Sequence, residues 1–250
     1  MGRHYKGLFA CATDIGKIRI SNEDRANVLT NFVGDVFLII CDGMGGQNKG
    51  DYASKVACDL LSESFKRKRT TPLILTRLWL RRVLKEANSL IFEEASKNKA
   101  YEGMGTTCVA VYIQGEKMIV ANIGDSRAYK YGYGRLERLT EDQTYVDYLY
   151  RTGKIDAQEK ETSPERHILM NALGVYPSLA PDISIHPYHG EAILCCSDGL
   201  YNNVSEAEIR AVLSTDERPD MKVSSLIAEA NGNGGSDNIG ISYWEVIDHD

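Results

Sequence analysis

The sequence predicts an α+β sandwich, in which two pairs of helices cover a core of two β-sheets. The 250 residues alternate between strand-like and helical stretches in a simple order. Apolar strand-like runs come first, two amphipathic helices follow, a second set of strands comes next, and two more helices precede a last strand. No internal repeat or low-complexity linker interrupts this order, so we expect residues 1–250 to form one domain.

Three strands are predicted in the first part of the chain, over residues 7–13, 26–30 and 37–41. The third, Phe37-Leu38-Ile39-Ile40-Cys41, is a run of five apolar residues, which is typical of a strand buried on both faces. It stops at Asp42. The glycines of Gly43-Met44-Gly45-Gly46 allow the backbone to turn sharply there and to approach a small ligand closely. One Asp-Gly pair alone indicates only a tight turn.

The period changes near residue 51, where apolar residues begin to recur every three or four positions and predict an amphipathic helix up to Phe65. A second helix is predicted from Thr71-Pro72, with Thr71 as N-cap and Pro72 in the first turn, to near Asn98. Between the two helices lies the basic run Lys66-Arg67-Lys68-Arg69, which we interpret as a solvated loop.

The second half of the chain repeats this alternation. It begins with predicted strands over 104–113, 118–123 and 128–131, followed by a helix from 140 to 153 that opens with Thr140-Glu141-Asp142-Gln143. A polar insertion over 154–174 beside the cleft and a connector over 177–187, which holds at most a short strand, come next. The predicted elements after them are a strand from 192, a helix capped by Ser205-Glu206-Ala207-Glu208, a last helix over 220–230, and a strand over 239–246.

Composition excludes several classes of protein. Hydrophobic residues make up 43% and charged residues 26% of the chain, as in ordinary globular domains. The net charge of −6 argues against nucleic acid as the main partner. No apolar run approaches the roughly 18 residues of a membrane span, so no membrane partner is expected. The six cysteines form no C-x-x-C pair, which favours reduced thiols and a cytoplasmic location.

Acidic residues recur where predicted strands end or begin. Asp42, Asp125 and Asp198 each follow an apolar run, and Asp237 precedes one, while Glu23-Asp24 lies between two strands. Because strand ends gather at the edges of a sheet, we expect these side chains to converge on one acidic cleft. Carboxylates packed together repel one another unless cations neutralise them or some of them stay protonated. An all-oxygen set of this kind suits Mg²⁺ or Mn²⁺ better than zinc.

Two such ions can bind a phosphate ester and lower the pKa of a water molecule that attacks phosphorus. Arg19, four residues before Glu23, is placed to hold the phosphate, because a guanidinium matches its oxygens. Other chemistries fit less well. No cysteine is followed six positions later by an arginine, Asp51 stands where a Walker lysine belongs, and His186-x-x-His189 would point to opposite faces of a strand. Paired carboxylates could also serve a glycosidase, but no aromatic sugar platform lies near them.

Six motifs occur in the order found in metal-dependent protein serine/threonine phosphatases (PPM, type 2C), which this chain resembles over nearly its whole length. They are Arg19-Ile20-Ser21-Asn22-Glu23-Asp24, Cys41-Asp42-Gly43-Met44-Gly45-Gly46, Gly105-Thr106-Thr107, Asn122-Ile123-Gly124-Asp125-Ser126-Arg127, Cys196-Ser197-Asp198-Gly199-Leu200 and Ser236-Asp237-Asn238-Ile239. Every acidic position of the family is filled. The Gly-Met-Gly-Gly form and the compact length resemble the bacterial branch.

The resemblance implies a four-layer α/β/β/α sandwich with two Mn²⁺ or Mg²⁺ ions between the sheets. By that likeness Asp42 bridges both ions and the carbonyl of Gly43 helps to hold one, while Asp198 and Asp237 hold the other. One departure concerns Met44, since animal members carry there a histidine proposed as the general acid. Methionine cannot donate a proton.

The same likeness assigns further residues. Glu23 and Asp24 would act through bound waters, and Asp125 would join Asp198 at a weaker third ion. Arg19 matches the phosphate-binding arginine of the family. The segment 140–174 corresponds to the mobile flap beside the site.

We therefore expect a monomeric enzyme that removes phosphate from serine or threonine of proteins phosphorylated by a bacterial Ser/Thr kinase. Two alternatives stay open. One is a pseudophosphatase that binds phosphoproteins without turnover, and the other is a metal-dependent phosphoesterase that acts on small molecules.

Overall fold

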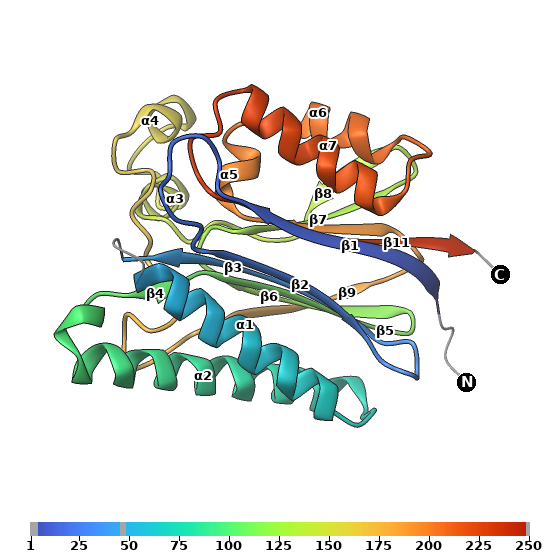
Figure 1. The fold of residues 1–250 in the computed structure, drawn as a ribbon, viewed down its shortest axis with the longest axis horizontal. Coiled ribbons are helices and arrows are strands. Elements are labelled where there is room, and N and C mark those ends of the chain that lie inside the picture. The colour runs from blue at the N-terminus through green and yellow to red at the C-terminus, as the bar shows by residue number, and fades with distance from the viewer. Residues whose placement is uncertain (1–4, 46–48, 249–250) are drawn as a thin grey trace.

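Two antiparallel β-sheets lie face to face between two layers of helices (Figure 1). This computed structural model describes residues 5–45 and 49–248, so Gly46 of the predicted glycine turn lies outside the described residues. The arrangement confirms the predicted α/β/β/α sandwich. Strands that are far apart in the sequence are neighbours in both sheets, because the chain crosses between the sheets several times.

The first sheet contains the first and last strands of the chain side by side. Its spatial order is β1 (Lys6–Asp14), β11 (Ile239–Asp248), β10 (Ala192–Cys196), β7 (Arg127–Gly132) and β8 (Arg135–Arg138). The second sheet has the order β2 (Asp24–Thr30), β3 (Val36–Met44), β5 (Cys108–Gln114), β6 (Lys117–Ile123) and β9 (Asp182–Pro187), and the short β4 (Gly105–Thr106) pairs with the end of β3.

Helices cover the outer face of each sheet (Figure 1). The pair α1 (Lys49–Arg67) and α2 (Leu73–Lys97) covers the second sheet, and the pair α6 (Glu206–Leu213) and α7 (Pro219–Gly232) covers the first. The shorter helices are η1 (Lys99–Tyr101), α3 (Tyr145–Arg151), α4 (Ala157–Thr162) and α5 (Asp198–Tyr201). Within the described part of the chain, none of the helices combines the length and apolarity that crossing a bilayer requires.

Three apolar layers hold the four layers together, and β3 belongs to two of them. Phe37, Ile39 and Cys41 pack under the α1–α2 pair, whereas the alternate residues Leu38 and Ile40 pack between the sheets. Alternation along a strand places successive side chains on opposite faces. A run of apolar residues without interruption is therefore what this central strand requires.

The turn between β2 and β3 fixes how these strands align. The side chain of Asn31 accepts the backbone N–H groups of Val33 and Asp35 and donates to the carboxylate of Asp35. The buried hydroxyl of Tyr112 also donates to Asp35, at 2.8 Å. In the resulting register Asp24 lies directly opposite Asp42.

The predicted helix start at Thr140 is wrong. The helix α3 begins at Tyr145, and its N-cap is Thr144, whose hydroxyl accepts the backbone N–H of Asp147. The hydroxyl of Thr140 accepts the N–H of Ala128 in β7, and Asp142 is held by arginines. The motif is therefore tied to the sheet and cannot cap a helix.

Other local predictions also need correction. Thr71 does not cap α2, whose N-cap is Pro72. The hydroxyl of Thr71 instead accepts the ammonium of Lys68 and lies 3.2 Å from the hydroxyl of Thr76. The predicted strand over 104–113 is split at Thr107, whose N–H donates to the carbonyl of Asp42. The elements β8, α4 and α5 were not predicted. The capping box of Ser205 and Glu208 is confirmed.

Candidate active site

A cavity of about 950 Å³ opens where β3 ends, α5 begins and the loop before β11 passes. Seven of the eight residues predicted for the site line it: Arg19, Glu23, Asp42, Gly43, Asp125, Asp198 and Asp237. The eighth, Asp24, is fully buried behind the lining. Acidic side chains from distant parts of the chain thus lie together at this cavity, as the sequence predicts.

Asp42 is held by its backbone on both sides. Its N–H donates to the hydroxyl of Thr107 at 3.0 Å, and its carbonyl accepts the N–H of Thr107 at 2.8 Å. The hydroxyl of Thr106 donates to the same carbonyl. At the next position only glycine fits, because a Cβ on Gly43 would collide with the carbonyl of Gly50 at the start of α1.

Asp24 faces Asp42 across the β2–β3 pair and has one oxygen without a partner. The hydroxyl of Ser197 donates to Oδ2 of Asp24 at 2.6 Å, but the buried Oδ1 has no hydrogen-bond donor among the described residues. Burial, followed by the charges of Asp198 and Asp237, raises the pKa of Asp24 to about 7. A buried carboxylate oxygen with no donor calls for a cation or an ordered water.

The other aspartates of the cavity are perturbed in the same direction. Burial and the nearby charge of Asp237 raise the pKa of Asp198 to about 6. Burial and the charge of Asp198 raise the pKa of Asp125 to about 8. Burial also raises the pKa of Asp42 far above its ordinary value, and Asp24 is the strongest of the neighbouring charges. The cavity therefore carries more negative charge than its own cations neutralise.

Arg19 is a cation that contacts this group directly. Its Nη2 lies 2.7 Å from Oδ2 of Asp237, and the charges of Asp198 and Asp42 also raise the arginine pKa after that hydrogen bond. Asn238 fixes the loop on which Arg19 lies. Its amide donates to the carbonyls of Ile15 and Ser21 at 2.9 Å.

The oxygen set fits a hard divalent cation by chemistry, although its side chains are turned to protein partners here. Among residues 5–45 and 49–248, no three His, Cys, Asp or Glu side chains surround one point with metal-ligand geometry. Asp237 is turned to Arg19, and Asp42 lies within hydrogen-bonding reach of Asp24 and Asp198. Rotation of these side chains alone would redirect their oxygens toward a common cation.

Several lining residues were not predicted from the sequence. Arg166, His167 and Leu169 come from the insertion between α4 and β9, and Asn202 comes from the end of α5. The amide of Asn202 donates to Asp198 at 3.1 Å. The insertion showed only a polar composition, so nothing in its pattern set Arg166 and His167 apart from their neighbours.

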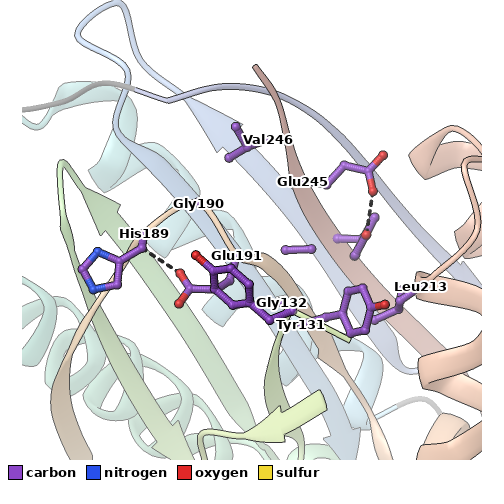
Figure 2. A pocket seen from close by; sticks show the side chains of 11 residues that line it. Tyr131, Gly132, His189, Gly190, Glu191, Leu213, Glu245 and Val246 are labelled. Atoms are coloured by element: carbon purple, nitrogen blue, oxygen red, sulfur yellow. Dashed lines mark hydrogen bonds between the residues drawn. The ribbon is translucent and has the colours of Figure 1, made fainter. Parts of the chain in front are cut away.

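Another cavity, of about 520 Å³, lies among β7, β10, β11 and the end of α6 (Figure 2). Its carboxylates already have donors. Glu191 accepts the backbone N–H of His189 (Figure 2). Glu245 accepts the ammonium of Lys222 and the hydroxyl of Tyr243. None of the predicted site residues lines this cavity, so the acidic cavity is the candidate active site.

Comparison with known proteins agrees with this site. The protein phosphatase 2C family matches residues 19–224. A serine/threonine phosphatase of Listeria welshimeri, stp, is 38% identical over 237 residues, which cover 93% of each chain. The serine/threonine phosphatase Stp1 of Staphylococcus aureus superposes with a TM-score of 0.90 and 31% identity, over 99% of this chain and 97% of that one.

A further relative bears on metal binding. The catalytic domain of the serine/threonine protein phosphatase PstP, solved in complex with 2 manganese ions, superposes with a TM-score of 0.82 and 30% identity, over 97% of this chain and 99% of that one. The sequence match, the sandwich and the acidic cavity point the same way. The chain belongs to the protein phosphatase 2C family, in its bacterial branch.

Proposed function

We propose that this chain removes phosphate from phosphoserine and phosphothreonine of proteins by direct attack of water at a centre of two divalent cations. The observation that carries the proposal is the meeting of four aspartates and Glu23 with Arg19 in one cavity. Within this cavity burial raises the pKa values of Asp42, Asp125 and Asp198, so bound cations would take the place of protons in neutralising these carboxylates.

The residues divide into roles around Mn²⁺ or Mg²⁺. We assign Asp42 to both ions, the carbonyl of Gly43 to one of them, and Asp198 with Asp237 to the other. When bound, such ions lower the pKa of water and neutralise the charge of a phosphate ester. Asp125, which lies beside Asp198, would complete a weaker third site.

Two acidic residues act from outside this set. Asp24, behind the lining, and Glu23, whose N–H donates to Asn238, would hold ordered waters rather than ions directly. The buried Oδ1 of Asp24 has no hydrogen-bond donor among the described residues, so an ordered water would supply one.

Arg19 would hold the phosphate. Its guanidinium lies 56% exposed at the cavity and contacts Asp237 through one nitrogen only, which leaves other donors for phosphate oxygens. The flap, residues 140–174, brings Arg166 and His167 to the cavity and would act on substrate entry and water exclusion. We further propose that residues 1–250 act as one domain, as a cytoplasmic monomer, on substrates of a bacterial Ser/Thr kinase.

Turnover of a phosphothreonine peptide tests the proposal. We expect hydrolysis with Mn²⁺, loss of hydrolysis with a chelator, and recovery when Mn²⁺ is restored. Asp42→Asn should lower kcat by at least about 100-fold, since even outer-shell partners of metal sites cost 10- to 100-fold. Asp59→Asn, a change in an exposed ion pair of α1, is the matched control.

Two results would contradict the proposal. Peptide binding without hydrolysis under every metal condition would favour a pseudophosphatase. Hydrolysis of small phosphate esters with none of phosphopeptides would favour the small-molecule phosphoesterase.

A further inference from the structure

Positive charge is concentrated in one segment of an otherwise acidic chain. Residues 64–85 hold eight of the 29 Lys and Arg residues and no Asp or Glu, so the remaining chain carries 21 basic residues against 35 acidic ones. The segment runs from the end of α1 through the connecting loop into the first half of α2. An asymmetry of this size gives one face of the molecule a potential opposite to that of the rest.

Most cations of this segment have no acidic partner. Arg69, Arg81, Arg82 and Lys85 are exposed, and no carboxylate pairs with them within the described part of the chain. Lys68 differs, because its ammonium lies over the rings of Trp79 and Tyr112 and is structural. The unpaired guanidinium groups are therefore free to bind anions outside the chain.

Large apolar side chains lie on the same outward surface. Ile74, Leu75 and Leu78 are 57%, 48% and 54% exposed, although apolar side chains of this size are usually buried in a core. Ile74 and Leu78 share a helical stripe with Arg81 and Lys85, at intervals of four, three and four residues. The opposite face of α2 packs on the sheet, so this stripe faces outward from the outermost layer (Figure 1).

A hollow of about 470 Å³ is lined by both cationic and apolar residues. It lies between the end of α1 and the start of α2. Its lining includes the cations Arg67, Lys68, Arg69 and Arg82, the apolar Leu75 and Trp79, and the carboxylates Glu63 and Glu86. Apolar and cationic groups thus share a concave surface, on which four cations outnumber two carboxylates. We call Arg69, Ile74, Leu75, Leu78, Arg81 and Arg82 the basic α2 face.

We propose that the basic α2 face binds the surface of an anionic phospholipid bilayer. Exposed apolar side chains beside unpaired cations match a bilayer, in which phosphate groups lie next to the acyl boundary. An acidic protein partner would use the cations but has less need of three adjacent apolar side chains. The acidic remainder of the chain would be repelled, which fixes one orientation.

This orientation leaves the acidic cavity open. The carbonyl of Gly50, at the start of α1, packs against Gly43 at the cavity, whereas the basic α2 face adjoins the end of that helix. Nineteen residues of helix span about 28 Å. Docked protein can therefore still meet phosphoproteins in solution. The proposal replaces the expectation of a merely solvated loop and of no membrane partner, and it requires no membrane-spanning helix.

Flotation with lipid vesicles tests the proposal on the full chain. We expect the protein to float with vesicles of phosphatidylglycerol and phosphatidylcholine, and not with vesicles of phosphatidylcholine alone. Binding should fall at least tenfold at about 0.5 M salt, where the screening length shrinks to roughly 4 Å. Absence of flotation with the anionic vesicles at low salt would overturn the proposal.

Matched variants separate a bilayer from an acidic protein. Arg81→Glu/Arg82→Glu and Leu75→Ser/Leu78→Ser should each weaken binding at least tenfold. The controls on the opposite helix layer, Arg210→Glu/Arg218→Glu and the half-exposed Met221→Ser, should float as the wild type does. All variants should keep wild-type phosphopeptide turnover in solution, which shows that they are folded.

Two further outcomes would overturn the proposal. One is wild-type flotation of the serine variant, since a bilayer contact needs the apolar side chains. The other is binding to soluble polyglutamate as tight as that to vesicles, which would identify an acidic protein surface. Flotation is measured without substrate, so it succeeds or fails independently of the proposed catalytic activity.

Discussion

The guanidinium of Arg19 and the carboxylate of Asp237 lie 2.7 Å apart, although 218 residues separate them in the sequence. The contact joins the loop after β1 to the loop before β11, and those two strands pair along their whole length. Pairing of the first and last strands therefore brings Arg19, the candidate for phosphate binding, next to Asp237, a candidate metal ligand. It also predicts a competition between phosphate and Asp237 for the same guanidinium.

Arg19→Ala should raise KM for a phosphopeptide by about 10- to 100-fold, because a charge-assisted hydrogen bond contributes about 1.5–3 kcal/mol. The effect on kcat should be smaller. Arg19→Lys should recover part of the loss, and Arg210→Ala on α6 is the control. A wild-type KM for Arg19→Ala, measured by steady-state kinetics, would remove this residue from the site.

Thr107→Val should lower both activity and stability. The hydroxyl of Thr107 accepts the N–H of Asp42 at 3.0 Å and lies 2.7 Å from the hydroxyl of Ser126. Leaving these buried groups without a partner costs about 1–3 kcal/mol of unfolding free energy and should shift Asp42. Thr107→Ser keeps the hydroxyl and should restore activity. Equal activity of the Val and Ser variants would show that Asp42 needs no such support.

His167→Gln should slow substrates that have a poor leaving group. Met44 lines the cavity but cannot donate a proton, and His167 is the imidazole among the described lining residues. The variant should lower kcat for a phosphoserine peptide more than for p-nitrophenyl phosphate, whose leaving group needs no protonation. His189→Gln, outside this cavity, is the control. An equal loss for both substrates would exclude proton donation by His167.

Stability without metal should fall as pH rises from 6 to 8. Folding raises the pKa values of Asp24 to about 7 and Asp125 to about 8 from 3.8, so the folded state holds protons that the unfolded state has released. Their stabilising effect is complete below pH 3.8 and is lost as pH passes through the folded values.

Thermal unfolding in the presence of a chelator measures this effect. Each pKa unit by which folding raises the pKa of one such group corresponds to a drop in Tm of about 3–5 °C once the group has lost its proton. Saturating Mg²⁺ should reduce the drop, because bound cations replace the protons. The same drop with chelator and with Mg²⁺ would contradict the assignment of these aspartates to a metal site.

The sequence predicted the layers and the acidic cavity well because both depend on short patterns. The apolar run from Phe37 to Cys41 is typical of a strand buried on both faces, and Asp42, Asp125, Asp198 and Asp237 each lie close to an apolar run. Burial on both faces and sharp strand ends are local signals. The convergence of the aspartates follows from the geometry of sheets, in which strand ends gather at one edge.

The errors at Thr140 and Thr107 share one physical cause, which is competition from partners distant in sequence. Thr140 has the composition of a helix cap, yet its hydroxyl bonds to β7, and Thr107 interrupts a strand because Asp42 recruits it. Arg166 and His167 reach the cavity only through the path of the insertion. No local pattern encodes such contacts.

The turn at Asn31–Asp35 sets the alignment of a hairpin whose far end carries the chemistry. Slippage of β2 against β3 by one residue would place Arg25, not Asp24, opposite Asp42 and would turn every side chain of the strand to the other face. A residue inserted into this turn would therefore abolish activity without touching the cavity. Catalysis thus depends on the length of a five-residue turn at the other end of the hairpin.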